Sequence, residues 1–172
     1  MRQLALTKAT LLTPFNLIED AVVLINGRTV MAAGHYTTIN IPPGFREIPL
    51  EGLLIAPGFI DQHVHGGKGA EFMAAEPGQM IEIEKFLATH GTTSFLATTF
   101  SAPFEKLTEV AKAYAVFNVT NYKGARCLGL HLEGPFLSPE FPGIHSVNYL
   151  QLPSLDQVLN VHRNSNFGIK MI

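Results

Sequence analysis

The stretch FIDQHVHGG, residues 59–67, places His63 and His65 one residue apart at the end of an apolar segment. Residues 53–60 are nearly all apolar, which is typical of a parallel strand covered on both faces. Because residues i and i+2 of an extended strand point to the same face, both imidazoles can reach one point in space. Neutral imidazole is a good ligand for zinc and other first-row metals. The spacing therefore predicts one side of a metal site at the end of a buried strand.

Asp61 lies two residues before His63 and faces the same side, where its carboxylate can orient or supplement the histidines. Gly66 and Gly67 then let the chain turn away sharply. The two histidines also fit a plainer interpretation, in which neighbouring groups satisfy their hydrogen bonds at an ordinary strand end. The motif alone leaves both interpretations open.

Strand-like and helix-like segments alternate after residue 52. Residues 92–100 and 127–133 are β-rich, as residues 53–60 are, and the closing FGIKMI reads as the start of a fourth strand. Apolar residues at helical spacing predict helices between these strands, the last one starting at Ser154 with Gln157 in a capping box. This rhythm predicts a parallel α/β sheet, either a barrel or an open doubly wound sheet.

The first part of the chain has a different sequence pattern from the rest. Residues 21–25 and 29–33 are short β-rich runs around Asn26-Gly27, the pair best suited to a type I′ hairpin turn. The proline-rich residues 39–49 follow and interrupt any further sheet. We therefore expect a small β domain over residues 1–52 and an α/β domain over residues 53–172.

A second group of polar residues lies in HLEGPFLSPEFPGIHS, residues 131–146. Glu133 comes at the end of its strand, so it should lie at the same sheet edge as His63 and His65, where active sites of parallel α/β folds form. His131 is interpreted as a core histidine. His145 lies in a loop rich in glycine and proline, a position suited to ligand contact.

The composition narrows the setting. The chain has 172 residues, 47% of them hydrophobic, with a formal net charge of −2, which argues against nucleic acid or an anionic membrane as a partner. The single Cys127 forms no internal disulfide, so a cytoplasmic location is expected. No apolar run reaches the length of a membrane span, and the first residues lack a secretory signal pattern.

These motifs resemble those of a known family. APGFIDQHVHGG resembles the first barrel strand of the metal-dependent amidohydrolase superfamily, and GTTSFLATT, residues 91–99, is similar to a second strand of one of its families. HLEGPFLSPEFPGIHS is similar to the signature loop of that family, the N-acetylglucosamine-6-phosphate deacetylases. The resemblance implies the N-terminal half of a (β/α)8 TIM-type barrel: the first three βα units and the start of the fourth strand. Part of a small β-sandwich precedes it.

The resemblance also implies roles for single residues. Glu133 matches the family's central metal-binding glutamate, and His63 and His65 match a pair that some members keep and others replace. A divalent metal, zinc in the first instance, is expected as one or two ions. His145, with Ile144 before it, falls where the family contacts its sugar substrate, and the family's usual residue at position 144 is smaller.

The implied reaction is hydrolysis of the N-acetyl group of N-acetylglucosamine 6-phosphate, giving glucosamine 6-phosphate and acetate. The family's two further histidine ligands and its general-base aspartate are expected beyond Ile172. We therefore expect this chain alone to be inactive and weakly folded or prone to association, and the full-length enzyme to be a homo-oligomer. Lys68 is interpreted as a solvated loop lysine.

Two other readings of the residues stay open. The chain can belong to another amidohydrolase branch, such as the dihydroorotase-like or hydantoinase-like cyclic amidases, in which a modified lysine near the position of Lys170 bridges the metals. It can also be a noncatalytic fragment or interaction module that keeps only the first metal ligands.

Overall fold

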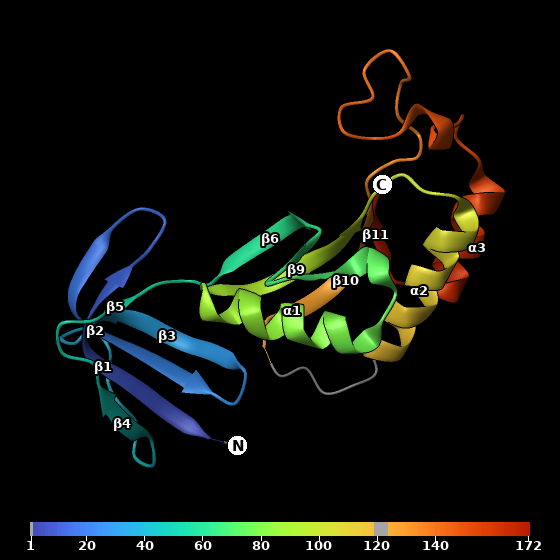
Figure 1. Ribbon diagram of the computed structural model, residues 1–172. Helices are drawn as coiled ribbons and strands as arrows, with labels where there is room; N and C mark the ends of the chain where they lie inside the picture. Colours follow the sequence, from blue (N-terminus) through green and yellow to red (C-terminus); the bar gives the residue numbers. More distant parts are fainter. Residues whose placement is uncertain (1, 119–123) are drawn as a thin grey trace. The chain divides into compact units, whose positions relative to one another are not determined.

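The computed structural model describes residues 2–118 and 124–172, which form two compact units, Met1–Pro57 and Gly58–Ile172. Figure 1 shows the strands of the first unit and the mixed strands and helices of the second. The expected change in sequence pattern along the chain therefore corresponds to two separately packed units.

The first unit is built on one sheet. The strand order is β3-β2-β1-β4, and β5 pairs with β1. The strands span β1 Gln3–Leu12, β2 Leu17–Asn26, β3 Thr29–His35, β4 Arg46–Pro49 and β5 Leu54–Ile55. Apolar clusters around Val22 and Val23 occupy opposite faces of β2, as the alternation of a strand requires. The β-sandwich itself stays a prediction.

The hairpin between β2 and β3 confirms the prediction but shifts its turn by one residue. Asn26 pairs with Thr29, so Gly27 and Arg28 are the central residues of the turn. Of the two, only Gly27 has a positive φ, 61°. The predicted type I′ turn needs positive φ at both central residues, so that turn type was wrong.

The strand predicted over residues 53–60 is divided in two. Leu54 and Ile55 pair with β1 in the first unit, and β6, Phe59–Val64, begins the sheet of the second. Pro57 lies between β5 and β6 and lacks the backbone N–H that a continuous strand would use for pairing. The division falls after Pro57, beyond the predicted position near Gly52. Phe59 and Ile60 are 71% and 62% exposed, so the expectation of a strand covered on both faces was wrong there.

The second unit contains a parallel sheet of four strands. Their order is β11-β10-β9-β6, and each neighbouring pair is parallel. The bounds are β9 Thr92–Thr99, β10 Arg126–Leu132 and β11 Ile169–Met171. Because the order follows the sequence without the reversal of a doubly wound sheet, the arrangement is that of a half barrel.

Among the described residues, three helices connect these strands, as predicted. They span α1 Pro77–Thr89, α2 Phe104–Asn118 and α3 Leu155–Asn164. Ser154 is the N-cap residue of α3 but makes no side-chain capping bond, so the predicted capping box does not form. In the described part of the chain, no helix is both long enough and apolar enough to cross a membrane.

A hairpin and two short turns complete the second unit. The strands β7 Gly66–Gly67 and β8 Ala70–Glu71 pair in antiparallel fashion directly after His65. Turns of 3-10 helix span Phe72–Ala74 and Val147–Tyr149.

The core of the second unit joins all three helices to the sheet. Helix α1 contributes Met80, helix α2 Tyr114 and helix α3 Val161, and these residues belong to one cluster with Phe95 of β9 and Leu130 of β10. All five are at most 2% exposed. In Figure 1, α1 runs alongside β9, the strand that it contacts. This packing fixes the strand ends on which the polar residues of interest lie.

Cys127 on β10 is expected to be unreactive in the folded chain. Burial raises the pKa of its thiol to about 11, and the thiol donates to the carbonyl oxygen of Gly129 at 3.4 Å. Against the ordinary value of 9.0, the thiolate fraction at pH 8 falls about 100-fold. DTNB at pH 8 should therefore label Cys127 only after denaturation. Labelling of the native chain at the rate of a free cysteine would contradict this.

Candidate metal centre

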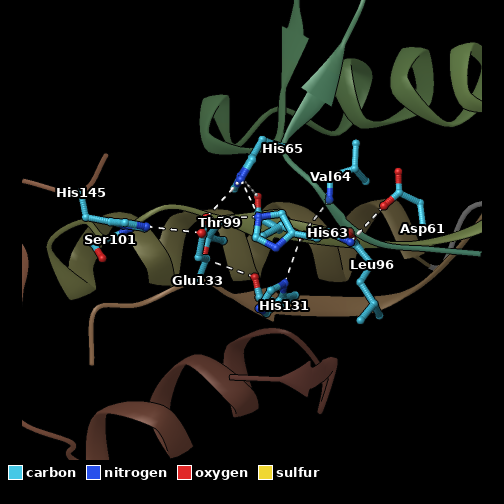
Figure 2. A network of polar contacts seen from close by, with 11 residues as sticks. Asp61, His63, Val64, His65, Leu96, Thr99, Ser101, His131, Glu133 and His145 are labelled. Atoms are coloured by element: carbon cyan, nitrogen blue, oxygen red, sulfur yellow. Dashed lines mark hydrogen bonds and ion pairs between the residues drawn. The ribbon is translucent and has the colours of Figure 1, made fainter. Parts of the chain in front are cut away.

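His63, His65 and Glu133 meet at the C-terminal edge of the parallel sheet. His63 lies near the end of β6, His65 directly follows that strand, and Glu133 directly follows β10. One ligand atom from each residue lies within 4.8 Å of the others. Figure 2 shows the three side chains turned toward one another. The structure thus brings two neighbouring histidines together with a carboxylate that is distant from them in sequence.

The donor atoms are closely spaced. The Nε2 atoms of His63 and His65 are 3.1 Å apart. Oε2 of Glu133 lies 3.4 Å from Nε2 of His63 and 3.1 Å from Nε2 of His65. A tetrahedral zinc ion with Zn–N distances of 2.0–2.1 Å has neighbouring donors about 3.3 Å apart. The three atoms therefore have the spacing of three corners of such a site.

The orientation of His65 is set by its surroundings. Its Nδ1 lies 3.2 Å from the carbonyl oxygen of Thr98, which only accepts hydrogen bonds, so Nδ1 carries the proton. Its ring stacks on Phe100 with the centroids 3.8 Å apart. In the tautomer with its single proton on Nδ1, the Nε2 lone pair of His65 faces Glu133, which is the arrangement of a metal-ligating histidine.

The hydrogen bonding within this group is incomplete. Oε2 of Glu133 is buried and has no hydrogen-bond partner among the described residues. While both imidazoles are neutral, at most one hydrogen, on Nε2 of His63, is available to three electron-rich atoms. A cation placed between them would remove this repulsion, since buried charges are stable when paired or bound to metal. The donor set therefore fits a divalent metal ion.

Gly66 is required at the end of this segment by a close approach. A Cβ at this position would collide with the backbone of Ala70 and Glu71 on the opposite strand of the short hairpin. Only glycine lets the chain leave the histidines at this angle. The pair Gly66-Gly67 thus allows the sharp turn predicted from the sequence.

Asp61 acts on the backbone of the histidine segment. Its Oδ1 accepts a hydrogen bond from the main-chain N–H of His63 at 3.0 Å. The carboxylate is not part of the cluster of possible metal ligands found in the described residues. Of the two roles considered for it, orienting the ligands is the one that this geometry supports.

His145 reaches the same site from the loop after β10. Its Nε2 lies 3.5 Å from Oε1 of Glu133, and its side chain is only 4% exposed. Nδ1 accepts the main-chain N–H of Ser101 at 3.2 Å, so the proton of the neutral ring is on Nε2. His145 is therefore a hydrogen-bond donor toward the site. Ile144 is 79% exposed and lies largely in solvent.

His131 lies beneath the ligand group on β10. It is buried, and its Nδ1 lies 3.3 Å from Oγ1 of Thr98. Burial lowers the pKa of His131, and the nearby His63 lowers it further. These contacts agree with the interpretation of His131 as a core histidine kept neutral.

Two lysines considered from the sequence lie outside this group. Lys68 is exposed in the turn between β7 and β8, which fits a solvated loop lysine. Lys170 is exposed on β11, where its side chain lies close to Gly129. Neither position supports a role in the metal centre.

Sequence comparisons identify relatives of known activity. The chain is 32% identical over 143 residues to the N-acetylglucosamine-6-phosphate deacetylase of Vibrio furnissii, covering 81% of the chain and 35% of that protein. It is 30% identical over 155 residues to the Bacillus subtilis enzyme of the same name, covering 85% and 39%. An N-acetylgalactosamine-6-phosphate deacetylase of Escherichia coli O157:H7 is 33% identical over 115 residues, covering 65% and 30%. Comparison with protein-family models gave no match.

Solved structures agree with these relatives. N-acetylglucosamine-6-phosphate deacetylase from Pasteurella multocida superposes with a TM-score of 0.82 at 25% identity, covering 98% of this chain and 44% of that one. The Thermotoga maritima enzyme gives a TM-score of 0.72 at 30% identity, covering 91% and 39%. A variant of the Mycobacterium smegmatis deacetylase in complex with N-acetyl-D-glucosamine-6-phosphate gives a TM-score of 0.79 at 26% identity, covering 99% of this chain and 43% of that one.

The chain spans less than half the length of each of these proteins. Over that span the agreement is nearly continuous and includes both the β unit and the parallel sheet. In sequence and in fold, the chain belongs to the N-acetylglucosamine-6-phosphate deacetylase family of metal-dependent amidohydrolases.

Proposed function

We propose that this chain carries the first metal ligands of an enzyme that hydrolyses the N-acetyl group of N-acetylglucosamine 6-phosphate. The products would be glucosamine 6-phosphate and acetate. One observation carries the proposal: Nε2 of His63, Nε2 of His65 and Oε2 of Glu133 converge, with 3.1 Å between the two nitrogens and 3.4 and 3.1 Å from them to the carboxylate oxygen. The names of the relatives supply the reaction and the substrate.

Zinc is the proposed ion, as one or two atoms. Two imidazoles and one carboxylate form a borderline donor set that suits zinc better than calcium or magnesium, which prefer oxygen ligands. A bound divalent ion supplies a water of lowered pKa and polarises the amide carbonyl. His63, His65 and Glu133 would hold this ion at the sheet edge.

His145 is proposed to bind the substrate beside the metal centre. Because Ser101 occupies Nδ1, the Nε2–H of His145, which lies 3.5 Å from Oε1 of Glu133, can donate to a carbonyl or hydroxyl oxygen of a substrate bound there. A preorganised donor of this kind stabilises negative charge that develops on a carbonyl oxygen. Ile144 is proposed to border the substrate from the exposed side of the same loop. The proton transfers of hydrolysis are left to the family's general-base aspartate, which the resemblance places outside this chain.

A turnover assay tests the proposed function. The complete gene product, loaded with zinc, should release acetate from N-acetylglucosamine 6-phosphate. N-acetylgalactosamine 6-phosphate is the appropriate competitor, since one relative is named for it. If acetate is released from neither sugar phosphate, the proposal is contradicted. We also propose that the active form is a homo-oligomer in the cytoplasm.

Substituting His145 should separate substrate chemistry from metal binding. In the complete gene product, His145→Ala is expected to lower kcat by about 10²–10³-fold, the usual effect of removing one such donor. Zinc content should not change, because Nε2 of His145 carries a proton and is not a ligand. His90→Ala, an exposed histidine after α1, is the matched control. Loss of zinc from the His145 variant would show that His145 is itself a ligand.

A further inference from the structure

The segment that carries the two histidines lies outside the regular strand ladder. Asp61 on β6 pairs with Phe95 on β9, and the next regular pair joins Val64 to Ala97. The register shifts between these two pairs, as at a β-bulge. A bulge leaves main-chain groups without ladder partners, and such groups need other acceptors when they are shielded from water. His63 lies within this irregular segment, and His65 follows it.

Thr98 supplies one of the missing acceptors and also contacts His65. Its Oγ1 accepts the main-chain N–H of Val64 at 3.1 Å, and its carbonyl oxygen accepts Nδ1–H of His65 at 3.2 Å. The side chain is fully buried. The hydroxyl also donates to the carbonyl oxygen of Leu96 at 3.3 Å, so its lone pairs can accept, and it lies 3.3 Å from Nδ1 of His131. One buried residue therefore holds both the backbone between the histidines and the ring of the second histidine.

Asp61 supplies the other acceptor. Its Oδ1 accepts the main-chain N–H of His63 at 3.0 Å, one residue before the bond made by Thr98. Two consecutive amides of the bulge are thus held by side chains from two strands. Figure 2 shows Asp61 on the flank of this segment, with His63 and His65 extending toward Glu133.

We infer that Thr98 and Asp61 are positioning residues that hold the β6 bulge so that His63 and His65 point at one metal ion. This inference rests on the proposed metal centre. The two residues act through the backbone and through the ring of His65 and do not touch the metal. Residues that orient metal ligands in this way typically change metal affinity by 10–100-fold when replaced.

Thr98 offers a discriminating set of variants. Thr98→Val keeps the shape but removes the acceptor, whereas Thr98→Ser keeps the acceptor. The matched control is Thr99→Val, which removes a hydroxyl that is equally buried and donates only a long 3.5 Å bond to the carbonyl oxygen of His131. Each variant is made in the complete gene product, and circular dichroism checks that it folds. Asp61→Asn and Asp61→Ala form a second pair, since asparagine keeps an acceptor oxygen.

Two readouts test the inference separately from the proposed function. In the metal-free complete gene product, amide hydrogen exchange at Val64 should rise at least about 10-fold in Thr98→Val, as expected for a lost hydrogen bond. It should stay near the wild-type rate in Thr98→Ser and Thr99→Val. Zinc affinity, measured by competition with a chelator, should fall by about 10–100-fold in Thr98→Val and Asp61→Ala and recover in the serine and asparagine variants.

The outcomes are distinct. Unchanged exchange at Val64 in Thr98→Val would overturn the inference whatever the metal does. Faster exchange with unchanged zinc affinity would overturn the positioning role. If the wild-type complete gene product binds no zinc, the proposed metal centre fails, and the positioning role that rests on it is overturned too, although the exchange data would still report on the bulge.

Discussion

Replacing Glu133 with glutamine is expected to remove zinc binding by the chain. Glutamine keeps the size of the side chain but loses the negative charge that faces the two Nε2 atoms of His63 and His65. The loss of a direct ligand should exceed the 10–100-fold effect of replacing residues that only orient ligands, so affinity should fall by more than about 100-fold. Zinc per chain after dialysis, measured by elemental analysis, checks this.

Glu140→Gln is the matched control for this substitution. Glu140 is exposed in the same loop region and is not part of the ligand cluster found in the described residues. Its replacement should leave zinc content unchanged. Equal zinc retention by the wild-type chain and the Glu133 variant would mean that the carboxylate is not a ligand.

Replacing Leu130 with alanine should strongly destabilise the second unit. Leu130 is fully buried on β10 and belongs to the core that joins the sheet to the helices. Removing a buried leucine side chain lowers the free energy of unfolding by about 2–5 kcal/mol. Urea unfolding followed by circular dichroism measures the change.

Leu128 on the same strand provides the comparison. It is 39% exposed, so Leu128→Ala should lower the free energy of unfolding far less. An equal loss of unfolding free energy in the two variants would show that the stability of the second unit does not depend on the core described here.

The architecture of the second unit was predictable because its signals are local. Apolar periodicity located the helices, and β-rich runs located β9 and β10 to within a residue at each end. The alternation of strands and helices could not distinguish a barrel from a doubly wound sheet, because the difference lies in which strands are neighbours. The strand order, which follows the sequence, decided it.

The errors arose where pairing overrode composition. Residues 53–60 have the composition of one strand, yet Leu54 and Ile55 pair with β1 while Phe59 starts another sheet. The hairpin turn moved because Asn26 joined the ladder by pairing with Thr29. Both outcomes depend on partners distant along the chain or on register, which a local pattern does not encode.

The three residues that could bind a metal together were identifiable from the sequence, but the residues that support them were not. His63, His65 and Glu133 carry their chemistry in their residue types and lie at strand ends. Thr98 belongs to a run of β-branched residues that favours a strand and gives no sign of its bond to the Val64 amide. The proton position on His145 depends on the amide of Ser101, 44 residues away.

The most direct test of the metal centre is anomalous X-ray scattering at the zinc edge from crystals of the chain grown with zinc. We predict an anomalous peak bounded by Nε2 of His63, Nε2 of His65 and a carboxylate oxygen of Glu133, at zinc–ligand distances of about 2.0–2.2 Å. A zinc-saturated crystal with no peak between these three residues would contradict the proposed centre.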